Sequence, residues 1–200
     1  MSDIQTFRRR ISPEQQQRRE LILGQATLLV QAQGHEVAME AVAAAAGVSR
    51  TTLYRYFTSR EHLLAEVTLL QAQNLLNNLI VLPPAGHTVG EKVQDLCQSI
   101  ASLDRENARL LGACIHNLSS RDPAVLDSFA AIEGLVSQMF TTVLRQSVPS
   151  RWLNVETVLF RYLFGSLVLA TTDKINYSAL AEDMAALCRS LLGDAWWEPA

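Results

Sequence analysis

The segment VAAAAGVSRTTLYRYF, residues 42–57, constrains the fold more than any other part of the chain. Its first half is rich in alanine, a strong helix former, and ends at Gly47, which permits a tight turn. After the turn, Leu53 and Phe57 lie four residues apart and so share one face of a second helix. The small alanines allow the two helices to cross closely. The segment therefore predicts a helix, a tight turn and a second helix.

The rest of the chain has the apolar spacing of helices. No segment shows sustained alternation of apolar and polar residues, and glycine and proline gather between the periodic stretches. We therefore expect an all-α fold, with helices near residues 13–34, 39–46, 49–57, 60–80, 88–103, 105–119, 122–147, 152–171 and 178–192.

Several predicted helices begin with residues that favour a helix N-terminus. Ser12 can cap the first helix, Pro13 suits its first turn, and Gln15 completes a capping-box pattern. Ser49 and Ser59 can cap the helices that follow the tight turn.

Charge is distributed unevenly along the chain. Residues 1–60 carry eight Lys/Arg and five Asp/Glu, giving +3, which leaves nine against fifteen, or −6, for residues 61–200. The basic residues include a run at Arg8–Arg10 and the pair Arg18 and Arg19. Such an arm can neutralise phosphates, and the alternative is a solvated tail without that role.

The cysteines and the lack of long apolar runs indicate the cellular compartment of the protein. Cys97, Cys114 and Cys188 are an odd number at wide spacing, which favours reduced thiols over a disulfide framework. The N-terminus lacks the apolar stretch of a signal peptide, and no apolar run approaches the roughly 18 residues that span a bilayer. We expect a cytoplasmic protein.

The helix after Gly47 carries a polar face suited to DNA. Arg50 aligns with Tyr54, and Thr51 aligns with Arg55, on the side away from Leu53. Arginine can bond a guanine edge through two donors, threonine can bond a base edge or touch a thymine methyl, and tyrosine hydroxyls reach phosphates. The pattern indicates a DNA-binding helix-turn-helix, against the alternative of one without a DNA role.

At this point the sequence resembles a known family, the tetracycline-repressor (TetR) family of regulators. The resemblance lies in the pattern IL...AT.LV...G at 22–34 and in AVAAAAGVSRTTLYRYFTSREHLL at 41–64. It implies an N-terminal arm and three-helix DNA-binding domain in residues 1–60. It also implies a helical ligand-binding and dimerisation domain in residues 61–200.

The resemblance assigns roles to individual residues. The side chains that would face bases are Arg50, Thr51, Thr52 and Tyr54, and those that would hold phosphates are Tyr56 and Arg60. With Arg55 from the polar face, these residues form the predicted DNA-binding set. Ala38 stands where the family has a threonine that caps the second helix and bonds a phosphate, so this contact is not expected here.

The predicted helix 152–171 is apolar on two sides and so needs two partners. One is the core of its own domain. The other is the same helix of a second subunit, with Gly165, Ser166 and Ala170 small enough for close approach. Helix 178–192 would complete a four-helix interface. We expect a homodimer, and the alternative is a helix buried inside a monomer.

A ligand site is predicted from polar or aromatic side chains within apolar helical rows. The candidates are His116, Asn117, Gln138, Thr142, Arg161 and Phe164. The alternative is that these are hydrogen-bonded core residues without a ligand. Ligand sites are lined mainly by apolar groups, so we expect a small, largely apolar effector bound between the fourth and eighth helices.

The sequence does not predict an enzyme. It contains no GxGxxG, Walker-type loop, HExxH or GxSxG motif, and its histidines and cysteines lack metal-ligand spacing, so we expect no cofactor or metal. The predicted partners are double-stranded operator DNA, a second copy of the chain and a small-molecule effector that releases a repressor from DNA. The alternative is a DNA-binding dimer without an effector.

Overall fold

The protein is described here by a computed structural model covering residues 12–101, 105–116, 120–144, 155–171, 176–197 and 199. The elements are α1 (Pro13–Gln33), η1 (Gly34–Glu36), α2 (Met39–Ala45), α3 (Arg50–Tyr56), α4 (Arg60–Val81), α5 (Val89–Ala101), α6 (Arg105–His116), α7 (Pro123–Leu144), α8 (Val155–Thr171), α9 (Tyr177–Leu192) and η2 (Gly193–Trp197). In these ranges the one β-type pairing is an isolated bridge between Thr88 and Pro199. The predicted all-α fold is confirmed.

The helix starts follow the capping residues. Ser12 accepts a hydrogen bond from the backbone of Gln15, whose side chain bonds back to the Ser12 amide, as a capping box requires. The side chains of Ser49 and Ser59 each accept a hydrogen bond from a backbone amide in the first turn of α3 and α4, as predicted. The N-cap residue of α2 is Ala38, whose side chain cannot cap the helix.

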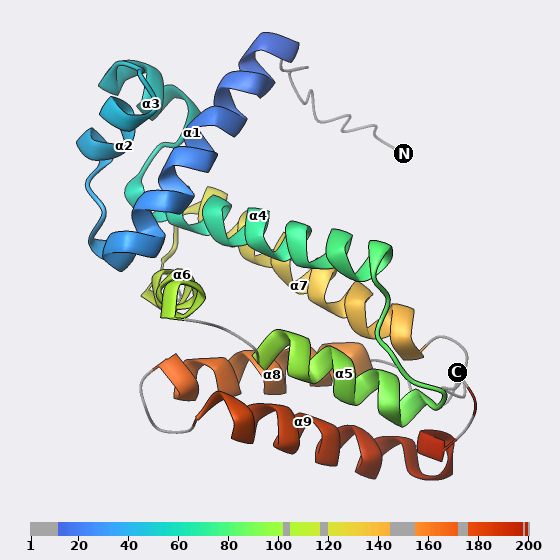
Figure 1. The fold of residues 1–200 in the computed structure, drawn as a ribbon. Helices are drawn as coiled ribbons and strands as arrows, with labels where there is room; N and C mark the ends of the chain where they lie inside the picture. Colours follow the sequence, from blue (N-terminus) through green and yellow to red (C-terminus); the bar gives the residue numbers. More distant parts are fainter. Residues whose placement is uncertain are drawn as a thin grey trace, which may run out of the picture.

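The helices form an N-terminal unit at one end of the molecule and a helical bundle at the other (Figure 1). Helices α1, α2 and α3 lie together at the upper left, while α5, α8 and α9 lie at the bottom. Helix α4 leaves the N-terminal unit and packs along α7, and α6 packs against both α1 and α4. Helix α4 is therefore a long element that reaches from one end of the molecule toward the other.

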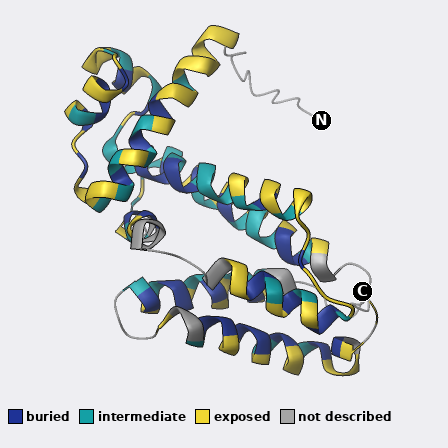
Figure 2. Ribbon diagram, viewed as in Figure 1, coloured by how far each residue is buried: buried dark blue, intermediate teal, exposed yellow. Residues whose placement is uncertain are grey.

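Two hydrophobic cores hold these parts together, and Figure 2 shows buried positions on the inward faces of both. The first includes Ile22, Leu53, Phe57, Leu63, Leu64 and Leu110, from α1, α3, α4 and α6. The second includes Leu96, Phe140, Leu159, Leu180 and Met184, from α5, α7, α8 and α9. The first core crosses the expected domain boundary at residue 60, because the start of α4 and part of α6 belong to it.

Helix α8 is apolar on two sides. Leu159 and Leu163 are buried in the second core, whereas Val158, Tyr162 and Leu169 are 48%, 37% and 46% exposed. The three exposed residues follow helical spacing and share one outer face. Of the three small residues predicted to allow close approach of a second subunit, Gly165 is exposed, but Ser166 and Ala170 are buried within the monomer.

None of the described helices is both long and apolar enough to cross a membrane.

Candidate nucleic-acid interface

The turn between α2 and α3 is built around Gly47. Its φ of +62° lies in the left-handed region that favours glycine. The next amide, that of Val48, donates a hydrogen bond of 3.0 Å to the carbonyl of Ala43. This closes the end of α2 and turns the chain so that α3 packs across it.

Helix α3 has one buried and one exposed side. Leu53 is fully buried, as is Phe57 directly after the helix, and both pack in the first core. The opposite side borders an open depression lined by Arg50, Thr51, Thr52, Tyr54 and Arg55. Thr52 also bonds the capping residue through its amide and hydroxyl. The structure thus brings five of the seven predicted DNA-binding residues onto one surface.

The other two predicted residues lie beside this surface. Tyr56 is half-buried against the first core, and the Arg55 guanidinium lies 5.5 Å from its ring centroid. Arg60 begins α4 and forms a half-exposed ion pair with Glu61, at 3.5 Å between Nη2 and Oε1. Neither residue lines the depression.

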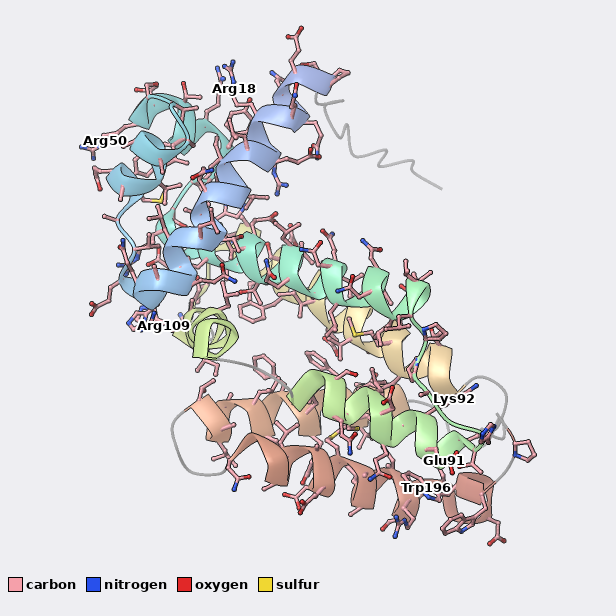
Figure 3. All side chains as sticks on the ribbon, viewed as in Figure 1. Arg18, Arg50, Glu91, Lys92, Arg109 and Trp196 are labelled. Atoms are coloured by element: carbon pink, nitrogen blue, oxygen red, sulfur yellow. The ribbon has the colours of Figure 1, made fainter. Side chains whose placement is uncertain are left out.

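An acidic side chain that the sequence analysis did not single out lies at this surface. Glu40, in the first turn of α2, forms an ion pair of 2.7 Å with Arg50 at the start of α3. Figure 3 shows Arg50 at the outer edge of the N-terminal unit. Glu40 is the one acidic residue of segment 39–57, and this isolated negative charge was the feature of the sequence that could have drawn attention to it.

The two arginines expected to act together at α1 have different surroundings. Arg18 is exposed and extends outward near the α3 end of the molecule (Figure 3). Arg19 instead pairs with Glu66 of α4, and its guanidinium lies 5.5 Å from the ring centroid of Phe57. The expectation that Arg19 belongs to a cationic arm is therefore wrong, because Glu66 neutralises its charge within the protein. The run Arg8–Arg10 lies outside the described residues.

Glu66 connects three helices. One carboxylate oxygen pairs with Arg19 of α1, and the other accepts a hydrogen bond of 2.9 Å from the Ser128 hydroxyl of α7. A second link between the halves runs from the Ser59 hydroxyl to the Asp122 carboxylate, at 3.2 Å. Sequence analysis missed these contacts because their partners are 47 to 63 residues apart.

His62 lies within this polar group. Burial lowers its pKa below the usual value, while the negative charges of Glu66 and Asp122 raise it and Arg19 lowers it further, with burial the largest cause. Its Nδ1 accepts a hydrogen bond of 3.2 Å from the Thr58 amide. The neutral imidazole suits this arrangement, since a protonated Nδ1 could not accept that bond.

A second junction joins α6 to the end of α1. Arg109 donates hydrogen bonds of 2.9 and 2.7 Å to the carbonyls of Gln31 and Ala32, where the last turn of α1 favours a cation (Figure 3). His116 stacks on His35 of η1, with ring centroids 4.5 Å apart. His116, predicted as a ligand contact, thus lies at the junction with the N-terminal unit.

The remaining predicted ligand residues are dispersed. Gln138 and Thr142 are exposed on α7, and Arg161 is exposed on α8, as is His116 on α6. Phe164 is half-buried and packs edge-on against Phe129 of α7, with centroids 6.4 Å apart. Of the described candidates, Phe164 is the half-buried one, and its ring contacts another helix of the C-terminal part. Asn117 lies outside the described residues.

The described cysteines are buried, unpaired thiols. Burial raises the pKa of both Cys97 and Cys188 to about 12, so they stay protonated at neutral pH. The side chain of Cys114 is outside the described part. Among the residues described, no group of three or more histidine, cysteine or acidic side chains could hold a metal ion.

Comparison with known proteins shows which proteins this chain is similar to. Residues 22–67, which hold α2, α3 and the turn between them, match the family model "Bacterial regulatory proteins, tetR family". The chain is 26% identical to the HTH-type transcriptional repressor KstR of Rhodococcus jostii (strain RHA1), over 94% of this chain and 89% of that protein.

Solved structures share the fold over most of the chain. A TetR transcriptional regulator from Rhodococcus sp. RHA1 superimposes with a TM-score of 0.77 at 22% identity, over 90% of this chain and 98% of that one. A tetR-family regulator from Streptomyces coelicolor gives a TM-score of 0.64 at 17% identity, over 86% and 81% of the two chains. Residues 22–67 are thus similar in sequence to bacterial regulatory proteins of the tetR family, and the described helices share the fold of solved members of that family.

Proposed function

We propose that the protein is a transcriptional regulator of the tetR family that binds a duplex operator as a homodimer, with α3 of each subunit in the major groove. The observation that carries the proposal is the division of α3 into two sides: Leu53 is fully buried, while Arg50, Thr51, Tyr54 and Arg55 are exposed around one depression. The buried side fixes the helix to the core. The exposed side offers donors and hydroxyls that match base edges and phosphates.

Different residues have different roles in this proposal. Arg50, Thr51, Thr52 and Tyr54 face the bases, and Arg55 lies on the same surface. Tyr56 and Arg60, beside it, bond the phosphates on either side of the groove. The exposed Arg18 of α1 adds positive charge near this end of the molecule.

The exposed apolar row of α8 supports the dimer. Val158, Tyr162 and Leu169 are large, partly exposed and aligned, and the exposed Gly165 between them allows close approach of a second helix. A two-fold dimer places two recognition helices in successive major grooves about 34–36 Å apart, or further if the DNA demands it. The operator is then an inverted repeat.

The test is selection of duplexes from a random-sequence library by the wild-type protein. We expect an enriched inverted repeat, bound with an affinity that falls steeply with salt because phosphates on both half-sites are neutralised. A library that stays unenriched, or binding that barely changes between low and moderate salt, would contradict the proposal. Sedimentation of the protein alone and on the selected duplex then gives the number of subunits.

We further propose that the regulator is a cytoplasmic repressor, released from its operator by a small, largely apolar effector. Its relative in Rhodococcus jostii is named a transcriptional repressor, which supports this direction of control. Helices α4 and α8 both pack against α6 and α7, so an effector between them would contact the elements that join α1. The half-buried Phe164 of α8, which contacts Phe129 of α7, is the residue that we propose to line this site.

Effector control has a thermodynamic test. An effector that weakens operator binding must itself be weakened by operator DNA by the same factor, typically worth about 1–3 kcal/mol. We would screen a panel of apolar metabolites by thermal shift and titrate each hit with and without the selected duplex. Hits that leave DNA binding unchanged, with DNA equally without effect on them, would favour the alternative of a DNA-binding dimer without an effector.

A further inference from the structure

We infer that Glu40 is a specificity-determining positioning residue: its carboxylate orients the Arg50 guanidinium toward one base and disfavours binding to other DNA. The inference rests on the proposed DNA-binding function and extends it to a residue outside α3. It starts from the 2.7 Å contact between Glu40 Oε1 and Arg50 Nη2.

The two side chains remain accessible to a ligand. The Glu40 side chain is 53% exposed and the Arg50 side chain is 64% exposed, so the pair lies on the surface of the protein. Arg50 also lines the depression on the exposed side of α3. The pair therefore lies where DNA would approach under the proposed function.

The chemistry of the pair leaves Arg50 free to contact a base. A guanidinium has five N–H donors in a planar fork, and the contact to Glu40 uses one edge of Nη2. The other donors can reach the O6 and N7 acceptors of a guanine. Because a long arginine side chain loses much freedom on binding, fixing its plane beforehand favours the base that matches that plane.

The charge of Glu40 supports a role in discrimination. A carboxylate on a surface that approaches phosphates is repelled by every DNA sequence, so it lowers the affinity for selected and random DNA alike. On a specific site, the repulsion is offset by the base contact that the oriented arginine makes. Glu40 also lies in the first turn of α2, where the helix dipole favours a negative charge and stabilises it at this position.

The test compares Glu40→Gln with Glu36→Gln, which removes the same charge from an exposed glutamate in η1. Each variant is titrated with the duplex selected by the wild-type protein and with a random-sequence duplex pool, and thermal midpoints confirm that both fold. We expect Glu40→Gln to lower the ratio of specific to random affinity by about tenfold, because only the selected duplex loses the contact with an oriented Arg50. Glu36→Gln should leave this ratio unchanged.

A second comparison shows whether Glu40 acts through Arg50. In an Arg50→Ala background, Glu40→Gln should cause no further loss of base preference. A further loss there would mean that Glu40 reads a base itself. Equal ratios of specific to random affinity for Glu40→Gln and Glu36→Gln would mean that only net charge matters. Either result overturns the inference. If the wild-type protein enriches no duplex, the proposed function fails as well, so the two failures are distinguishable.

Discussion

Ser128 of α7 donates a hydrogen bond of 2.9 Å to Glu66 of α4, whose other carboxylate oxygen pairs with Arg19 of α1. The Glu66 side chain is 13% exposed and that of Arg19 is 25% exposed, so solvent screens this pair only partly. One carboxylate thus joins the N-terminal unit, the long connecting helix and a helix of the C-terminal part. Any rearrangement of α7 relative to α1 must change the surroundings of Glu66.

Loss of the Glu66 charge should destabilise the fold. Glu66→Gln leaves Arg19 without its anion in a partly buried place, and we expect the free energy of unfolding to fall by about 1–3 kcal/mol. Urea denaturation measures this directly. The control Glu182→Gln removes the same charge from an exposed position on α9 and should change stability by less than about 0.5 kcal/mol. Similar losses in both variants would show that the three-helix contact contributes nothing particular.

Stability should decrease in mild acid through His62. Its pKa is lower in the folded protein than in the unfolded chain, with burial the main cause, so the unfolded state binds more protons as pH falls. The contribution is present above the unfolded pKa near 6.5 and is lost as pH falls through the lower folded value. The urea midpoint of His62→Gln should therefore change less between pH 7.5 and 5 than that of the wild type. The control His87→Gln, at an exposed position, should change as much as the wild type.

Charge on the outer face of α8 should disrupt the proposed dimer. Val158→Asp places a carboxylate in the exposed apolar row, where a second subunit would have to bury it. Sedimentation should show a shift toward monomer and a loss of cooperative binding to the two half-sites. Leu126→Asp makes a comparable change at an exposed position of α7 and should remain dimeric. Dimers in both variants would exclude the α8 row as the interface.

Arg60 should contribute affinity without base preference. Arg60→Ala is expected to weaken selected and random duplexes alike, and to reduce the slope of log affinity against log salt by about 0.9 for each lost phosphate contact, or ~2 per dimer. Lys92→Ala removes the same charge at the opposite end of the molecule from Arg50 (Figure 3) and should leave the slope unchanged. An unchanged slope for Arg60→Ala would remove this residue from the phosphate contacts.

Local signals predicted most of the fold. Ser12 with Gln15, and the serines before α3 and α4, set helix starts through contacts within three residues, and these hydrogen bonds are present. The two faces of α3 also follow from helical spacing alone. The sequence could not show that Arg19 is turned inward, because its partner Glu66 is 47 residues away.

The residues of the proposed ligand site are harder to predict for the same physical reason. A pocket is lined by side chains from several helices, and its residues are set by how those helices pack and not by spacing along one of them. His116 has suitable chemistry, yet its ring stacks on His35 at the junction with η1. Glu40 was missed because its contact to Arg50 depends on the angle at which α2 and α3 cross.

The most direct test of the account is the base preference of Arg50→Ala. The variant would be titrated with the duplex selected by the wild-type protein, with a set of duplexes that each change one base pair, and with random DNA. We predict a loss of about 1–3 kcal/mol on the selected duplex and loss of discrimination at one position in each half-site, with random binding much less affected. Equal weakening on selected and random DNA, with discrimination intact at every position, would contradict the claim that the exposed face of α3 reads the operator.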